Sequence, residues 1–201
     1  QDIRARAASR FRARSTDAFD LLAQIGRDCA GALQILPDGI TPENVDTVDA
    51  TPLAEHEAAA ILRGIVASPA LGGGTFEVDD FRISIAGAQE KTALTYIDGQ
   101  WCRPHGSTPT THILKLPMGL VGNMKLDLRY SIENEWLCSR ILGAYGLPVA
   151  ECEPLQFEDT KVLSVTRFDR AWLDGPRGRW LARLPQEDFC QATGTPAHLK
   201  Y

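Results

Sequence analysis

The 201 residues carry a formal net charge of -5, with 44% hydrophobic and 23% charged residues, a composition typical of a folded globular protein. The acidic balance argues against a general nucleic-acid or membrane-surface binder, and no apolar run approaches the roughly 20 residues that span a bilayer. Five cysteines, an odd number without a CxxC pair, favour reduced thiols in a cytoplasmic protein and argue against a metal site.

The first third of the chain predicts short elements around one local basic segment. Alternate arginines line residues 4–14, and a solvated helix face explains them better than a DNA-binding surface does (Arg4, Arg6, Arg10, Arg12, Arg14). A helix capped by Thr16 or Asp17 is expected to end near Gly26. Its apolar positions are Phe19, Leu22 and Ile25, and a strand is expected over Gly31–Leu36 before the turn Pro37-Asp38-Gly39.

A clearer helix is predicted to open at Thr51-Pro52, a capping residue followed by proline at the first helical position. Its apolar stripe recurs at helical spacing (Ala54, Ala58, Ile61, Ile65). The glycine-rich stretch Ser68–Gly74 then reads as a linker, and we expect a domain boundary there.

After this linker the pattern changes to strands. The runs Phe81–Ile85 and Thr92–Ile97 flank a small-residue loop, and Asp98-Gly99 predicts a two-residue hairpin that returns through Trp101. Further strands are expected over Thr111–Leu116, Val162–Phe168 and Trp180–Leu184. A helix is expected from Ser131 to Tyr145, stopped by Gly146, with an apolar face formed by Leu137, Ile141 and Ala144.

Three small residues, Ala86, Gly87 and Ala88, interrupt the strands and precede Gln89, Glu90 and Lys91. Such a loop lets backbone N–H groups approach a phosphate closely. Most short glycine loops are only turns, and neither GxxxxGK[ST] nor GxGxxG is present. The loop therefore becomes informative only together with the residues that follow it.

Lys115 lies on the strand Thr111–Leu116 and shares a face with Ile113. A lysine on a half-buried surface needs a partner, and Glu135, in the first turn of the predicted helix, is the best acid, with Glu133 as its rival. An edge-strand lysine with its ammonium in water, and an acid that only complements the helix dipole, are the alternatives. Thr166, Arg167 and Phe168 end a later strand, as an adenine-binding hinge or an ordinary strand end would.

A glycine loop between strands, a strand lysine, a helix acid and an outgoing strand are the parts of a protein-kinase nucleotide lobe, in that order. The chain resembles HipA-type kinase toxins in segments spread over nearly its whole length. They are FDLLAQIGRDCAGAL (Phe19–Leu33), SIAGAQEKTAL (Ser84–Leu94), TPTTHILKLP (Thr108–Pro117), NEW (Asn134–Trp136), RFDR (Arg167–Arg170) and LPQEDFCQ (Leu184–Gln191).

The resemblance implies an α+β fold: a protein-kinase-like N-terminal lobe with an antiparallel sheet and a helix, preceded by part of a small α/β subdomain. We expect residues 1–72 to be the C-terminal part of that subdomain and residues 73–201 to be the lobe. The implied activity is that of a serine/threonine protein kinase toxin in a bacterial toxin–antitoxin pair. The alternative is a non-catalytic interaction module that binds an antitoxin or a separately encoded partner.

Position by position, the resemblance implies ATP-binding roles for the phosphate loop (Ala86, Gly87, Ala88, Gln89, Glu90, Lys91), for Lys115, and for a hinge of Thr166, Arg167 and Phe168. Glu135 would hold the lysine. Ser84 matches an autophosphorylated serine, where a phosphate would silence the kinase by repelling ATP.

The family's catalytic aspartate and Mg²⁺-binding aspartate are not found and would lie after Tyr201, so these residues alone are expected to be inactive. The implied cofactors are ATP and Mg²⁺. The implied partners are a HipB-like antitoxin and a translation-related protein substrate, for which an aminoacyl-tRNA synthetase is the example. DNA would be reached only through the antitoxin, and no membrane is involved.

Overall fold

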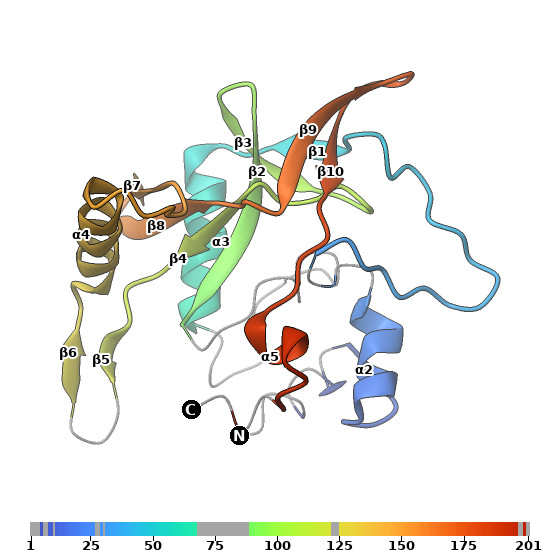
Figure 1. The fold of residues 1–201 in the computed structure, drawn as a ribbon, viewed down its shortest axis with the longest axis horizontal. Helices are drawn as coiled ribbons and strands as arrows, with labels where there is room; N and C mark the ends of the chain where they lie inside the picture. Colours follow the sequence, from blue (N-terminus) through green and yellow to red (C-terminus); the bar gives the residue numbers. More distant parts are fainter. Residues whose placement is uncertain are drawn as a thin grey trace.

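The computed structural model describes residues 5, 8–9, 11–26, 29, 31–67, 89–121, 125–196 and 199. Its centre is a six-stranded antiparallel sheet in the order β1-β3-β2-β4-β8-β7 (Figure 1). The strands are β1 (Ala50–Pro52), β2 (Lys91–Ile97), β3 (Gln100–Pro104), β4 (His112–Lys115), β7 (Cys152–Phe157) and β8 (Thr160–Thr166). The α+β class and the antiparallel sheet expected from the sequence are confirmed.

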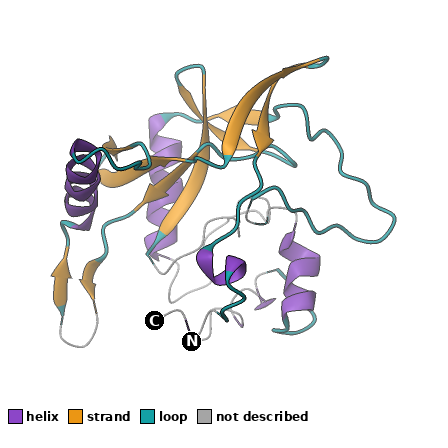
Figure 2. Cartoon of the chain, in the orientation of Figure 1, coloured by secondary structure: helices purple, strands orange, loops and turns teal. Residues whose placement is uncertain are grey.

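Two smaller sheets and four helices complete the described structure (Figure 2). The hairpins pair β5 (Gly119–Val121) with β6 (Leu126–Leu128), and β9 (Arg170–Gly175) with β10 (Gly178–Arg183). The helices are α2 (Ala18–Ile25), α3 (Glu55–Ala67), α4 (Ser131–Ala144) and α5 (Phe189–Ala192). None of the helices in the described ranges has the length and apolarity needed to cross a membrane.

Helix α3 packs on one face of the sheet and forms the main core. Leu62 of α3, Leu114 of β4 and Val162 of β8 are all completely buried in this cluster. Burial of each such aliphatic side chain contributes about 1.5–3 kcal/mol to folding, so this core stabilises the packing of α3 on the sheet.

Helix α4 lies against the opposite face. Side chains alternate across a strand, so Lys115 points away from the face on which neighbouring Leu114 packs with α3. Lys115 and Lys161 share that second face, because Lys115 is the cross-strand partner of Leu163, two residues from Lys161. Both lysines pair with acids in the first two turns of α4, and this helix packs beside β7 and β8.

The hairpin at Asp98-Gly99 forms as the sequence predicts. Ile97 pairs with Gln100, which leaves a two-residue loop in which Asp98 and Gly99 have φ of 49° and 86°. These positive values define the turn that matches the strands' twist, and glycine adopts them without steric cost.

Three local expectations are wrong. Residues 31–36 form a turn and extended loop instead of a strand. Thr51-Pro52 does not cap α3 but belongs to β1, whose edge position tolerates proline. Helix α3 begins instead after Ala54, whose N–H donates to the Glu57 Oε2 at 2.8 Å.

The third wrong expectation concerns the buried face of α4. Leu137 and Ile141 are 53% and 47% exposed, and Ala144 is also exposed, whereas Ile132 is the completely buried residue of the helix. Helical spacing located an apolar stripe correctly but could not tell which of two apolar faces meets the sheet.

Described elements on both sides of the expected division at residues 72–73 pack together, and the division itself stays a prediction. Strand β1 pairs with β3, and Leu53, Ala58 and Leu62 lie in the same core as Leu94 and Leu114. Residues 50–67 are therefore part of the central sheet layer. Residue 72 itself, and the predicted strand 81–85, lie outside the described residues.

Candidate functional site

Lys115, at the end of β4, donates its Nζ to Glu135 Oε1 of α4. Their side chains are 22% and 38% exposed, so the ion pair is half-buried yet reachable from solvent. The rival acid, Glu133, pairs instead with Lys161 at 2.5 Å, in a more exposed pair. The structure thus brings together Lys115 and Glu135, the pair that the sequence indicated. The two candidate acids have different partners, because Glu133 pairs with Lys161.

A second lysine lies directly beside the first. Lys91 opens β2 and is the cross-strand partner of Lys115, so both side chains project from the same face of adjacent strands. Burial, and then the positive charge of Lys115, lower the pKa of Lys91. The carboxylates of Glu90 and Glu135 act on Lys91 in the opposite direction, and Glu135 also accepts the hydrogen bond from Lys115.

The segment before β2 is fixed against the end of β4. Gln89 Nε2 donates to the carbonyl of Leu116 at 2.8 Å, and the Leu116 N–H donates to the carbonyl of Glu90 at 2.9 Å. Lys91 Nζ donates to the Gln89 carbonyl at 2.6 Å. Gln89, Glu90 and Lys91 therefore lie alongside Lys115. Ser84, Ala86, Gly87 and Ala88 lie outside the described residues.

A strip of aliphatic side chains continues from the lysines along the same face. Ala93 pairs with Ile113, and Ile113 pairs with Val165. Each of the three lies two residues along its strand from Lys91, Lys115 or Leu163, and therefore on the same face of the sheet. Ala93 is buried, whereas Ile113 and Val165 are only partly covered. The face therefore offers two positive charges at one end and an apolar surface beside them.

The predicted hinge is hydrogen-bonded to neighbouring segments. The N–H groups of Thr166 and Arg167 donate to the carbonyls of Glu151 and Thr111, at 2.8 and 2.9 Å. These two backbone donors are thus used within the protein. Phe168 is 76% exposed, and its ring is the part of the predicted hinge that a ligand could contact.

Comparison with known proteins places this geometry in a family. The family model described as HipA-like C-terminal domain matches residues 83–201, which is more than half of the chain. The chain belongs to the HipA family. The model described as HipA N-terminal domain also matches, over residues 1–36.

Two curated relatives align over nearly the whole chain. The Sinorhizobium fredii protein Y4mE, which carries the word kinase in its name, is 38% identical over 187 residues, 91% of this chain and 41% of its own length. The serine/threonine-protein kinase toxin HipA of Shewanella oneidensis is 28% identical and is covered over 39% of its length. This HipA-family chain thus spans about two fifths of the curated relatives it matches.

A solved structure shows the same fold. HipA in the complex of Shewanella oneidensis HipA, HipB and operator DNA superposes with a TM-score of 0.67 and 28% identity, over 97% of this chain and 42% of that one. The kinase-like lobe expected from the HipA resemblance is therefore confirmed at the level of the fold.

Sequence reasoning quoted RFDR as a motif of the HipA family but assigned no role to Asp169 or Arg170. Asp169 accepts hydrogen bonds from Arg167 Nε and Nη2 at 3.0 and 2.8 Å, and from Arg170 Nη1 at 2.8 Å. The three side chains are at most 4% exposed. Burial acts to raise the pKa of Asp169, but the hydrogen bonds and charges of the two arginines outweigh it and lower that pKa.

This cluster joins two segments of the HipA resemblance. Arg167 Nη1 donates to Thr110 Oγ1 at 3.1 Å, and Arg170 Nε donates to the Thr110 carbonyl at 3.2 Å. The RFDR turn is thereby fastened to the TPTTH loop before β4. A threonine-rich loop and, more than fifty residues later, a charged motif were the available signals, but only the structure shows that they are partners.

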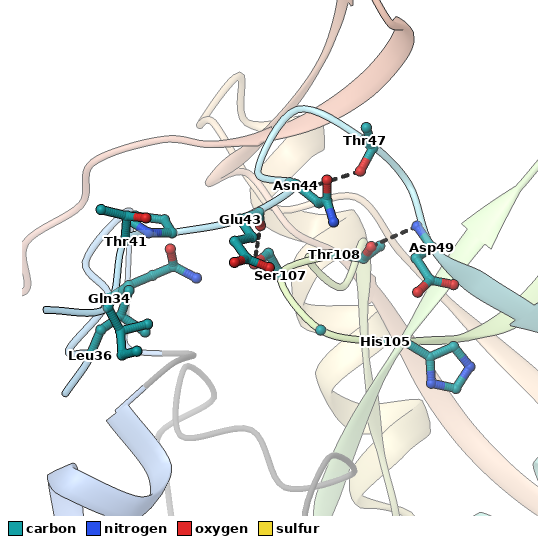
Figure 3. Close-up of a pocket in the computed structure, with 13 residues that line it drawn as sticks. Gln34, Leu36, Thr41, Glu43, Asn44, Thr47, Asp49, His105, Ser107 and Thr108 are labelled. Atoms are coloured by element: carbon teal, nitrogen blue, oxygen red, sulfur yellow. Dashed lines mark hydrogen bonds between the residues drawn. The ribbon is translucent and has the colours of Figure 1, made fainter.

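A separate pocket of about 360 Å³ lies between the loop of residues 34–49 and the turn at residues 105–108 (Figure 3). Its polar side chains include Glu43, Asp49 and His105, and none of the lysine-site residues lines it. His105 Nε2 is already hydrogen-bonded to Thr51 Oγ1 at 2.8 Å. No group of three or more metal-ligating side chains occurs among the residues that the structure describes.

Proposed function

We propose that this chain is the nucleotide-binding part of a HipA-type serine/threonine protein kinase toxin, and that ATP places its phosphates against Lys91 and Lys115. The observation that carries the proposal is the pair of lysines on one sheet face, with Glu135 holding Lys115. Two adjacent ammonium groups on one face can both donate charge-assisted hydrogen bonds to the oxygens of a triphosphate.

The same face supports an orientation for the rest of the nucleotide. The partly covered Ile113 and Val165 lie next to the lysines and offer an apolar surface to a purine ring. Phe168 follows the end of β8, and its exposed ring is available to contact the purine edge to face. Thr166 and Arg167 use their N–H groups within the protein. We therefore assign adenine binding to the apolar side chains just named and not to these two backbone donors.

Phosphate transfer requires groups beyond the ones described here. When bound, Mg²⁺ would neutralise charge on the β- and γ-phosphates. The described residues provide no carboxylate cluster for it. We therefore assign the metal ligands and the catalytic aspartate to the portion of the full-length protein outside these residues, and to this chain the task of binding and orienting ATP.

Regulation and partners are part of the proposal. Ser84 precedes the predicted phosphate loop, where a phosphate would repel those of ATP, so we propose it as the autophosphorylation site. Ser84→Ala in the full-length protein should keep substrate phosphorylation and lose self-inactivation; phosphate mapped to another residue would contradict this. Because the matching solved HipA is complexed with HipB, a HipB-like antitoxin is the proposed partner. A translation-related protein is the proposed substrate.

The decisive test compares two lysines that each pair with a glutamate of α4. ATP binding to the full-length protein is measured by titration calorimetry for wild type, Lys115→Met and Lys161→Met. Loss of a charge-assisted contact worth about 1.5–3 kcal/mol should weaken binding roughly 10- to 100-fold for Lys115→Met. Lys161→Met, which removes the exposed pair with Glu133, should bind like wild type.

Equal ATP affinity in all three proteins would contradict the proposed site. If none of them, wild type included, bound nucleotide, the chain would belong to a non-catalytic interaction module instead. Thermal unfolding of each variant shows whether a loss of binding reflects loss of folding.

A further inference from the structure

Helix α4 has two apolar faces, and the sheet covers only one. Ile132, on the inner face, is completely buried. Successive residues of a helix are 100° apart, so a second set of apolar side chains falls within one arc of about 140° on the outer side. These are Leu137, Cys138, Ile141, Leu142 and Tyr145, which we call the outer face.

The outer face is open to solvent in the structure. Leu137, Ile141, Leu142 and Tyr145 are 53%, 47%, 45% and 82% exposed. After the helix, Leu147 and Val149 add further exposed apolar side chains at 53% and 42%. A contiguous exposed apolar patch of this kind marks an interaction surface.

Charge is absent from the outer face. The acids of α4 are engaged on the sheet side, Glu133 with Lys161 and Glu135 with Lys115. Asn134 and Ser131, both uncharged, are the polar residues within the arc. Permanent interfaces resemble a domain core cut in half, with charged residues depleted at their centre, whereas separable partners meet more polar surfaces. The composition therefore favours a permanent covering.

We propose that the outer face of α4 is covered by the portion of the full-length polypeptide that lies outside these 201 residues. Each curated relative extends well beyond the aligned part, because the alignments cover 41% and 39% of their lengths. The matching HipA chain is covered over only 42%. More than half of such a protein is thus available to bury this face, and α4 stands at the outer end of the sheet, where a second body can approach it (Figure 1).

This inference does not depend on nucleotide binding. It predicts the surroundings of α4 in the intact protein whether or not Lys115 binds ATP, so failure of one proposal leaves the other standing.

Cys138 provides a probe, because it lies on the outer face and is exposed here. The full-length protein, without antitoxin, is treated with iodoacetamide under native conditions, and labelling of each cysteine is followed by peptide mass spectrometry. Cys138 should react at least tenfold more slowly than a thiol introduced by Asp174→Cys, an exposed position in β9. The rate should not depend on protein concentration.

Three outcomes would overturn the proposal. Rapid labelling of Cys138 in the isolated full-length protein would show an uncovered face. Protection that appears only at high protein concentration would identify a second copy as the occupant. Protection that appears only after a HipB-like antitoxin is added would identify the antitoxin.

Discussion

Two clusters in this molecule each bring two cations close to a carboxylate, and they differ in how much of their side chains is exposed to solvent. Arg167, Asp169 and Arg170 are almost completely buried, and Asp169 accepts hydrogen bonds from both guanidinium groups. Lys91, Lys115 and Glu135 remain partly exposed. The first, closed cluster therefore acts as structure, and the second, open one can still receive an anion.

The energetics of the two clusters follow from this difference. A buried carboxylate between two arginines is costly to remove, because its partners would remain charged in a medium of low dielectric constant. An exposed or half-exposed pair contributes little to folding, since water screens it. Mutation of the closed cluster should therefore affect stability, and mutation of the open one should affect binding.

The largest expected effect comes from Asp169→Asn. It leaves Arg167 and Arg170 buried without their carboxylate and should lower the free energy of unfolding by about 3–5 kcal/mol. Chemical denaturation of the full-length protein measures this change. Asp127→Asn is the matched control, because Asp127 also pairs with an arginine two residues away but on the surface. Similar stability of the two variants would erase the distinction between buried and exposed pairs.

The pH dependence of stability should reveal the same cluster. The pKa of Asp169 is lower in the folded protein than its ordinary value of about 3.9. Its contribution is thus complete above about pH 4 and is lost as pH falls through the folded-state value. Unfolding free energy measured from about pH 6 to about pH 3 should fall more steeply for wild type than for Asp169→Asn. Parallel curves would contradict this assignment.

A smaller effect, confined to binding, is expected for Lys91→Met. Folding disfavours the charged form of this lysine, as its lowered pKa indicates, so removal of the charge should leave the thermal midpoint unchanged or slightly higher. ATP affinity should fall about tenfold, or about 1.4 kcal/mol. Lys125→Met, at an exposed position beside β6, serves as control. A lower midpoint with unchanged affinity would make Lys91 a structural residue.

Local signals predicted much of the sheet. The Asp98-Gly99 turn, the strand around Lys115 and the ends of α4 depend on nearby residues, so the sequence was sufficient for them. Burial was harder to predict, because Leu137 and Ile141 are as apolar as a core pair yet lie outside it. Proline at Pro52 indicated a helix start, but pairing with β3 outweighed that local preference.

The candidate site divides in the same way. The residue types at Lys115 and Glu135 were readable from strand and helix patterns, together with the HipA resemblance. The neighbour relation of Lys91 and Lys115 depends on strand register across 24 positions of chain, which no local pattern encodes. The Asp169 cluster likewise required contacts between Arg167 and the distant Thr110.

The most direct test of the nucleotide site uses the unmodified full-length protein. Lysines are acetylated with a trace amount of reagent, with and without saturating ATP and Mg²⁺, and the modified positions are quantified by mass spectrometry. The two-lysine site predicts that ATP protects Lys91 and Lys115 severalfold and leaves Lys161 unchanged. If bound ATP left the acetylation of Lys115 as unchanged as that of Lys161, the triphosphate would lie elsewhere.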